Sequence, residues 1–457
     1  MENLPTIVSI STATGSAGIG IVRLSGANCF EILNKIFVPK NKKDKIKGYT
    51  MKYGNIVFED QVIDEVLVSY FVSPKSYTRE NMCEINTHGG MVVEKKILEA
   101  CLKSGAILAE PGEFTKRAFL NGRIDLSQAE AIMDLISSRS EKQARESINQ
   151  LEGGLSRKIN QIENKLLDTI TAIEVDIDYP EYDIEEIENR NALNECKEIL
   201  KDIEKLEESF KQGKIIKDGI KTVILGKPNA GKSSLLNTLL NEDRAIVSDI
   251  EGTTRDTIEE VCNINGIVLN LIDTAGIRKT NNEIEKIGVE KAKKLANESE
   301  LIIALFDITK NLEKEDFEIL NLIKDKNAIV VLNKIDLIEK NNQVENEVEK
   351  INKPIIKISA KNNEGVDKLY SAIEKMFNLD KIELNNDVLI TNERHKEQIR
   401  LANEDLRCAI DSMEKLMPID MSCIYIKKCL EDLGEITGKN VSEDVINQIF
   451  KNFCLGK

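Results

Sequence analysis

Residues 226–233 read Gly-Lys-Pro-Asn-Ala-Gly-Lys-Ser. The apolar run Lys221–Leu225 precedes this stretch, and a helical pattern begins at Ser234. A glycine-rich loop between a strand and a helix lets backbone N–H groups surround phosphates, while the lysine reaches the outer phosphates and the serine hydroxyl ligates Mg²⁺. The stretch therefore predicts a P-loop nucleotide site, and with it a parallel sheet covered by helices.

Three further motifs follow predicted strands in the order expected of a GTPase. Asp273-Thr-Ala-Gly276 would hold Mg²⁺ through water and offer an N–H to the γ-phosphate. Asn333-Lys-Ile-Asp336 would place a carboxylate on the two N–H donors of guanine, a pair that adenine lacks. Ser359-Ala-Lys361 would present an N–H to the guanine oxygen. Together the motifs predict GTP rather than ATP.

The segment between the P-loop and Asp273 is predicted to be the first switch. It contains Gly252-Thr-Thr-Arg-Asp256, in which Thr254 is the candidate that closes onto Mg²⁺ and the γ-phosphate. Many GTPases carry a glutamine directly after Asp-x-x-Gly to orient the attacking water, but Ile277 at this position cannot do so. Either the protein is a slow switch or another group positions the water. Glu285 is a candidate, although it can also be read as a solvated carboxylate at the start of a helix.

The complete set of predicted GTP contacts spans these motifs. Its members are Asn229, Ala230, Gly231, Lys232, Ser233, Ser234, Ser248, Asp249, Ile250, Glu251, Gly252, Thr253, Thr254, Asp273, Thr274, Ala275, Gly276, Asn333, Lys334, Asp336, Ser359, Ala360 and Lys361. Within this set, Ser233 and Thr254 are the predicted Mg²⁺ ligands.

Hydrophobic periodicity divides the chain into a multidomain α/β plus α protein. The first ~120 residues mix strands and helix, with strands expected at Thr6–Ile10, Ile21–Leu24 and Val62–Val72 and a helix at Glu94–Leu102. Long helical stripes follow at Ile148–Ile173, Leu193–Phe210 and Ile399–Met413, the first two separated by an acidic break at Asp176–Glu186.

Between the helical stretches the pattern alternates between strands and helices. The hairpin turn Asn265-Gly266 predicts one antiparallel edge strand. An α/β domain is therefore expected to be inserted into a helical domain. The predicted strands are Thr222–Leu225, Ile267–Ile272, Leu301–Phe306, Ala328–Leu332 and Pro354–Ile358.

Composition narrows the class of protein. With 457 residues, the chain has room for about three domains. A net charge of −15 means that RNA could be bound only through a local basic patch or a basic partner. The nine cysteines form no Cys-x-x-Cys pair and there are only two histidines, which excludes a disulfide framework and a histidine-rich metal site and favours the cytoplasm. No apolar run approaches the roughly 20 residues that span a bilayer, and no membrane anchor is expected.

These residues resemble the MnmE (TrmE) family, the GTPases of tRNA wobble-uridine modification, over the whole chain. The most specific matches besides the nucleotide motifs are Thr12–Gly26 (TATGSAGIGIVRLSG), His88-Gly-Gly, Pro111–Asn121, Asp125–Ala131 and the tail Phe453-Cys-Leu-Gly-Lys457.

The resemblance implies an N-terminal α+β domain that binds 5-formyl- or methylene-tetrahydrofolate and dimerises, a helical domain, and an inserted Ras-like P-loop GTPase domain. By matching position, the folate contacts would be Arg23, Glu84, Arg123 and Lys457, with Arg123 standing where some relatives have lysine. The implied boundaries are 1–120 for the N-terminal domain, 121–217 and 381–457 for the two parts of the helical domain, and 218–380 for the GTPase domain.

The resemblance also implies catalytic roles. K⁺ would take the place of an arginine finger, and Glu285 would position the water. Cys454 would take part in the modification chemistry, although a small residue filling a gap is an equal reading. The K⁺ ligands would be Asn229, Ser248, Ile250 and Thr253.

The implied partners are a second copy of the chain, tRNA, and the FAD-containing protein MnmG in a heterotetramer or larger complex. Together they would add a carboxymethylaminomethyl or aminomethyl group to C5 of the wobble uridine. The alternative is a regulatory GTPase of ribosome assembly.

The tail is expected to form a helix capped by Ser442 that docks on the helical domain and carries Cys454 and Lys457 towards the folate site. Its predicted apolar face consists of Val445, Ile446, Ile449, Phe450 and Phe453.

Overall fold

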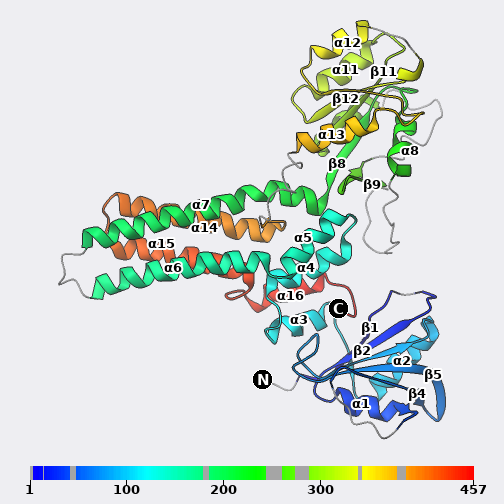
Figure 1. Cartoon of the computed structure of the whole chain (residues 1–457), viewed down its shortest axis with the longest axis vertical. Helices are drawn as coiled ribbons and strands as arrows, with labels where there is room; N and C mark the ends of the chain where they lie inside the picture. Colours follow the sequence, from blue (N-terminus) through cyan, green and yellow to red (C-terminus); the bar gives the residue numbers. More distant parts are fainter. Residues whose placement is uncertain are drawn as a thin grey trace. The chain divides into compact units, whose positions relative to one another are not determined.

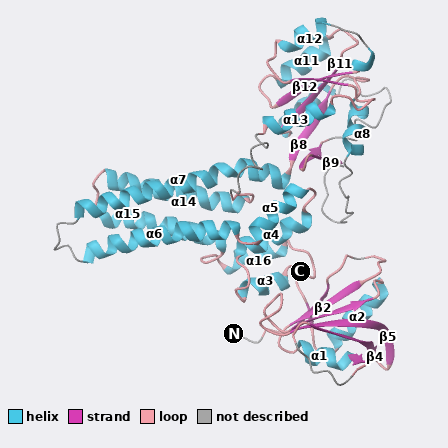
Figure 2. Ribbon diagram, in the orientation of Figure 1, coloured by secondary structure: helices cyan, strands magenta, loops and turns pink. Residues whose placement is uncertain are grey.

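The computed structural model describes residues 4–13, 15–41, 48–178, 185–242, 260–272, 288–337, 342–377 and 388–457. The chain forms two compact units, each containing one β-sheet (Figures 1 and 2). The first unit comprises Met1–Met133, Leu151–Glu163 and Leu430–Lys457, and the second comprises Asp134–Gln150 and Asn164–Cys429.

The first unit is built on a seven-stranded sheet in the order β3-β4-β5-β6-β2-β1-β7. Neighbouring strands are antiparallel except for the parallel pair β1 and β7. The strands are β1 (Ile7–Ile10), β2 (Gly20–Ser25), β3 (Phe37–Pro39), β4 (Thr50–Phe58), β5 (Gln61–Phe71), β6 (Met82–Thr87) and β7 (Ile107–Leu108).

Two helices supply the apolar cover of this sheet. Alternate residues of β2, such as Val22 and Leu24, pack with Leu33 of α1 and Ile97 of α2 in one buried cluster. This alternation is what a sheet with one buried face requires, and it confirms the three strands and the helix expected in the first ~120 residues. The helices within the unit are α1 (Cys29–Ile36), α2 (Met91–Lys103), α3 (Glu113–Leu120) and α16 (Glu443–Lys451).

The tail helix α16 packs against α3, which belongs to the N-terminal segment rather than to the long helices. The Phe450 ring lies 6.3 Å from the Phe119 ring and 4.9 Å from the Phe453 ring, measured between centroids. Ser442 occupies the N-cap position, but its side chain makes no capping hydrogen bond, so that part of the prediction is wrong. Val445 is 39% exposed and does not belong to the buried face.

Long helices form much of the second unit. Within it α7 and α14 pack side by side (Figure 1), which confirms the second and third predicted stripes. The helices α4, α6 and α15 run through both units, and α5 enters the first unit with its last residue. Their bounds are α4 (Leu126–Ser137), α5 (Glu141–Leu151), α6 (Gly154–Asp178), α7 (Glu185–Asp218), α14 (Glu393–Glu414) and α15 (Ile419–Thr437).

The first predicted stripe is divided between two helices. Gly153 has φ +83°, a left-handed conformation that ends one helix before the next begins. Ile148 therefore lies on α5, where it is 43% exposed, and is not part of the buried face. The continuous buried stripe runs along α6 from Leu155 to Ile173. Spacing by three and four residues cannot detect such a break, because both helices have the same period.

The second unit also contains a six-stranded sheet in the order β13-β12-β11-β8-β10-β9. All neighbours are parallel except β9 and β10, which are joined by the predicted hairpin with Asn265 at φ +51° and Gly266 at φ +83°. The strands are β8 (Ile220–Leu225), β9 (Glu260–Ile264), β10 (Ile267–Leu271), β11 (Leu301–Asp307), β12 (Ala328–Asn333) and β13 (Ile355–Ile358). These positions confirm the five predicted strands.

Both faces of the six-stranded sheet are buried. Ile224 of β8 packs into a cluster with Leu236 and Leu369, whereas its neighbour Val223 packs into another with Leu320. Because both faces are covered, the strands read as continuous apolar runs. The covering helices are α8 (Lys232–Glu242), α10 (Gly288–Glu298), α11 (Lys314–Ile323), α12 (Asn342–Glu349) and α13 (Val366–Met376), with the short 3₁₀ helix η1 (Ile335–Leu337) after β12.

Replacing Phe450 by alanine should destabilise the first unit by about 3–5 kcal/mol, because it removes a buried ring from the contact between α16 and α3. The matched control Val445→Ala, on the same helix, should change the free energy of unfolding by less than about 0.5 kcal/mol. Urea unfolding followed by circular dichroism measures both. Equal losses in the two variants would show that the tail helix is not held by its Phe450 face.

Candidate functional site

The described nucleotide motifs meet at one edge of the six-stranded sheet. The P-loop follows β8, the Asn333–Asp336 motif follows β12, and Ser359–Lys361 follows β13. These strands are parallel members of one sheet, so their carboxyl ends lie at the same edge. This is the edge at which ligands bind in open α/β sheets.

The backbone of the P-loop needs its two glycines. Gly231 has φ +103°, and a Cβ atom there would lie 2.1 Å from Nδ2 of Asn333. A Cβ atom at Gly226 would lie 2.5 Å from the carbonyl oxygen of Leu305. Asn229 adopts a left-handed conformation with φ +63°, which asparagine tolerates better than most residues. The loop is therefore fixed by close contacts with β11 and β12.

The two lysines of the P-loop have different roles. The ammonium group of Lys232 donates to the carbonyl oxygens of Gly226 and Lys227 at 2.6 and 2.8 Å, and burial lowers the pKa of Lys232. Lys227 instead pairs with Glu313 and Asp316 at the start of α11, at 2.6 and 2.9 Å. Lys232 is thus the cation inside the loop, while Lys227 ties the loop to a neighbouring helix.

Asn333 joins the P-loop, or phosphate loop, to the loop Ser359–Lys361, called the base loop because it is predicted to contact guanine. Its side chain is buried, with the residue 2% exposed. Nδ2 donates to the carbonyl oxygen of Ala230 at 2.9 Å, and Oδ1 accepts the N–H of Ala360 at 3.0 Å. One amide therefore satisfies groups on two separate loops, so it fixes their spacing.

Asp336 stands on η1 with its carboxylate exposed, and Oδ1 accepts the hydroxyl of buried Ser359 at 2.7 Å. This bond holds the carboxylate over the loop that follows β13. Thr238 of α8 donates its hydroxyl to the carbonyl oxygen of Ala360 at 2.8 Å. The base loop is therefore fixed from three sides, by Asn333, Asp336 and Thr238.

Lys334, with φ +70°, directs its ammonium group to Asp307 at the end of β11, at 2.6 Å. Burial acts to raise the pKa of Asp307, but hydrogen bonds from Lys334 and Thr309 outweigh it and leave that pKa below its ordinary value. The pair braces the turn that leads into η1.

The structure brings together the described residues of the predicted GTP set, which are those of the P-loop, the Asn333–Asp336 motif and Ser359–Lys361. The predicted residues Ser248–Thr254, Asp273–Gly276 and Glu285 lie outside the described residues. Within the described ranges no group of three or more His, Cys, Asp or Glu residues could hold a metal ion. Among the helices in the described ranges, none combines the length and the apolar character of a membrane-spanning segment.

The first unit gathers the residues predicted to contact folate. Arg23 of β2 is directly opposite Glu84 of β6, and their side chains form an ion pair at 2.7 Å. Arg23 also donates to the carbonyl oxygen of Gly456 in the tail at 3.1 Å, and Ser11 donates to the same oxygen at 2.9 Å. Burial, followed by the charge of Arg23, lowers the pKa of Lys457.

Tyr77 lies at the centre of this group. Its ring centroid is 5.6 Å from the Arg23 guanidinium and 4.3 Å from that of Arg123. The Nε atom of Arg123 is buried and has no hydrogen-bond partner among the residues that the structure describes. Because a buried donor left unpaired is costly, this atom marks a place where an acceptor from a ligand would be stabilising.

Cys454 is exposed, and its carbonyl oxygen accepts the N–H groups of Gly112 and Lys457 at 3.4 Å each.

The sequence did not reveal Tyr77, Ser11 or Thr238. Tyr77 lies between β5 and β6 with no motif around it, and its OH is hydrogen-bonded to Thr115 at 2.9 Å. Thr238 lies in an ordinary helical pattern, and only the fold places Ala360 beside it. The sequence offered a signal only near Ser11, which directly precedes the stretch Thr12–Gly26 noted for its family resemblance.

Comparison with known proteins adds two family models and several relatives. Residues 6–123 match the model described as GTP-binding protein TrmE N-terminus, and residues 126–454 match MnmE helical domain. Proteins named tRNA modification GTPase MnmE are 51% identical in Finegoldia magna, 49% in Acetivibrio thermocellus and 48% in Alkaliphilus oremlandii, each over 99% of both chains. The chain therefore belongs to the MnmE (TrmE) family of tRNA modification GTPases.

Proposed function

We propose that this chain hydrolyses GTP at the P-loop, within an inserted domain spanning 218–380, as part of an enzyme that modifies the wobble uridine of tRNA. The bridge from Asn333 to Ala230 and Ala360 carries the proposal, because it spaces a phosphate loop and a base loop for one nucleotide. The exposed Asp336 carboxylate beside Ser359 supports guanine as the base.

The described P-loop fits a magnesium-bound triphosphate. Lys232 already directs its ammonium group into the loop, and phosphate oxygens would replace the carbonyl oxygens as its acceptors. Ser233 lies in the first turn of α8, where a hydroxyl can ligate Mg²⁺ and the helix N-terminus favours negative charge. Thr254 and Asp273 would complete the Mg²⁺ site from segments outside the described residues.

Potassium would supply the positive charge that other GTPases take from an arginine finger. Asn229, at the bend of the P-loop with φ +63°, would be one of its ligands. Ser248, Ile250 and Thr253 would be its partners in the first switch. Glu285 would position the attacking water, since Ile277 cannot.

A tetrahydrofolate in the first unit would supply one carbon for the new group on uridine. Arg23, Glu84, Arg123 and Lys457 would hold it. The Nε atom of Arg123, which has no partner among the described residues, would suit an acceptor on such a ligand. We further propose that the chain acts as a homodimer with the FAD-containing partner MnmG, and that Cys454 serves the modification rather than GTP hydrolysis.

Nucleoside analysis of tRNA tests the proposed function as a whole. Cells that lack this chain should lose the carboxymethylaminomethyl or aminomethyl group at the wobble uridine, and the chain should bind tetrahydrofolate. Normal wobble-uridine nucleosides in the tRNA of such cells would contradict it. Accumulation of immature ribosomal subunits with normal tRNA would instead support a GTPase of ribosome assembly.

Asp336→Asn should weaken GTP binding roughly 10- to 100-fold, because the side chain loses its charge and one of its two acceptors for guanine. Xanthosine triphosphate, which presents an acceptor where guanine has an amino group, should bind the variant better than GTP. Nucleotide titration measures both affinities, with Asp325→Asn, an exposed aspartate of the same fold, as the control. Unchanged GTP preference in the Asp336 variant would remove the base site from the proposal.

GTP turnover should be more than about tenfold faster in K⁺ than in Na⁺, because a cation between the phosphates takes the position of an arginine finger, which is worth about 10³–10⁵ in rate. Asn229→Ala should reduce the ratio of the rate in K⁺ to the rate in Na⁺, measured at saturating GTP because Asn229 is also a predicted GTP contact. Turnover is measured in matched salts at constant ionic strength. Equal wild-type rates in the two salts would contradict the K⁺ site.

Cys454→Ser should leave GTP turnover near the wild-type rate and impair wobble-uridine modification. Cys408→Ser, at the exposed cysteine of α14, is the control and should change neither. If Cys454→Ser kept full modification, Cys454 would have no chemical role.

Deleting Gly456 and Lys457 should weaken folate binding, because the deletion removes the carbonyl oxygen that Arg23 and Ser11 hold, together with one ammonium group.

A further inference from the structure

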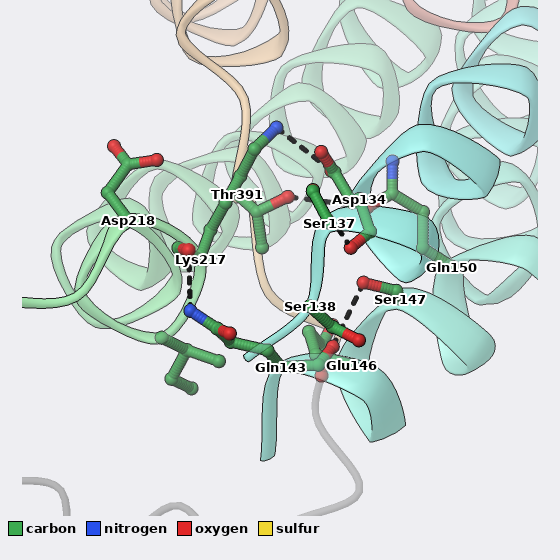
Figure 3. Close-up of a pocket in the computed structure, with 11 residues that line it drawn as sticks. Asp134, Ser137, Ser138, Gln143, Glu146, Ser147, Gln150, Lys217, Asp218 and Thr391 are labelled. Atoms are coloured by element: carbon green, nitrogen blue, oxygen red, sulfur yellow. Dashed lines mark hydrogen bonds and ion pairs between the residues drawn. The ribbon is translucent and has the colours of Figure 1, made fainter. Parts of the chain in front are cut away.

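A cavity of about 120 Å³, lined mostly by polar and charged residues, lies beside both places where the chain passes between the long helices and the six-stranded sheet (Figure 3). In the first crossing α7 ends at Asp218 and β8 begins at Ile220. In the second crossing Leu389–Thr391 leads into α14. Its lining includes Asp134, Gln143, Glu146, Gln150, Lys217 and Thr391.

Helix α5 turns a polar face towards this cavity. Gln143, Ser147 and Gln150 recur at intervals of four and three residues, which places them on one side of the helix. They are 7, 8 and 4% exposed. A helix usually buries its apolar side, so a buried polar stripe indicates that α5 is held by hydrogen bonds to specific partners.

The first partner is the end of α7. Gln143 donates from Nε2 to the carbonyl oxygen of Lys217 at 2.8 Å, and its Oε1 accepts the N–H of Arg139 at 2.6 Å. The Lys217 ammonium group pairs with Asp134 of α4 at 2.8 Å. At Lys217, two residues before Gly219, the first crossing is therefore held through both the backbone and the side chain.

The second partner is the segment that returns to the helices. Glu146 accepts the backbone N–H of Leu389, and Thr391 donates its hydroxyl to Gln150 at 3.3 Å. A Cβ atom at Gly213 of α7 would lie 2.1 Å from the carbonyl oxygen of Ile390, so α7 also approaches this segment closely. Three positions along α5 thus hold both crossings.

Glu146 is the group whose charge is least favourable in this cavity. Burial raises the pKa of Glu146 to about 7, against the opposing effect of hydrogen bonds from Leu389 and Asn149. The charged groups that line the cavity with it are Asp134 of α4 and Lys217 and Asp218 of α7; the returning segment 388–391 carries no charged side chain. Burial also raises the pKa of Asp218.

We propose that the polar face of α5 is a clasp that holds the two crossings together, closed when Glu146 carries a proton and loosened when it is ionised. Among the described residues that line the cavity, Lys217 carries the only ammonium group, and it is paired with Asp134, so an ionised Glu146 carboxylate has none beside it. Admitting water relieves that charge and opens the clasp. The proposal concerns the junction and depends on neither nucleotide, folate nor tRNA, so it stands or falls separately from the proposed function.

Backbone hydrogen exchange in the full-length protein measures the opening. Peptides that cover Lys217–Gly219 and Leu389–Thr391 report the two crossings, and β11 reports the rest of the fold. With a pKa of about 7 closed and the ordinary 4.5 open, the opening equilibrium should rise roughly tenfold between pH 6 and pH 8, after correction for the intrinsic exchange rate. Protection in β11 should not follow this change.

Glu146→Gln should abolish the pH dependence, since the amide keeps the shape without titrating. The matched control Glu141→Gln, at an exposed carboxylate of the same helix, should keep it. Gln143→Ala should increase opening at the first crossing, and Gln150→Ala at the second, by roughly three- to tenfold, the effect of one lost hydrogen bond. A pH dependence that persists in Glu146→Gln would overturn the role of Glu146, and unchanged exchange in both glutamine variants would overturn the clasp.

Discussion

The spacing between two loops, fixed by the buried amide of Asn333, is the constraint on which the nucleotide site depends. The amide donates to the phosphate loop at Ala230 and accepts from the base loop at Ala360, and it is close enough to Gly231 to exclude any side chain there. If that amide were lost, two buried backbone groups would lose their partners at once. The parallel sheet places both loops at one edge. The hydrogen bonds of Asn333 set the distance between the loop predicted to hold the phosphates and the loop predicted to hold the base.

The tail shows the same principle in the first unit. Gly456 has φ +88° and its carbonyl oxygen is shared by Ser11 and Arg23, which lie more than 400 positions away in the sequence. Arg23 in turn is paired with Glu84 across adjacent strands. Residues from the two ends of the chain therefore complete one charged group, and the aromatic packing of α16 on α3 brings the tail to it.

Much of the fold follows from local pattern. The strand that leads into the P-loop, the hairpin at Asn265-Gly266 and the long stripe of α7 are all readable because their period or turn chemistry is local. The expectations that failed concern boundaries and faces. The left-handed Gly153 divides a stripe that looked continuous, and Ser442 stands at an N-cap without capping, because side-chain direction depends on what packs nearby.

By itself the sequence determined that this chain carries a P-loop, a guanine-specific motif and the marks of one family, because those residues must occur at fixed short spacings for their chemistry. Tertiary structure alone decided which distant groups meet: Thr238 with Ala360, Arg123 with Tyr77, and the polar face of α5 with the two crossings. Such contacts depend on the path of the backbone between the residues. No local spacing records that path, since each partner satisfies ordinary helical or loop patterns on its own.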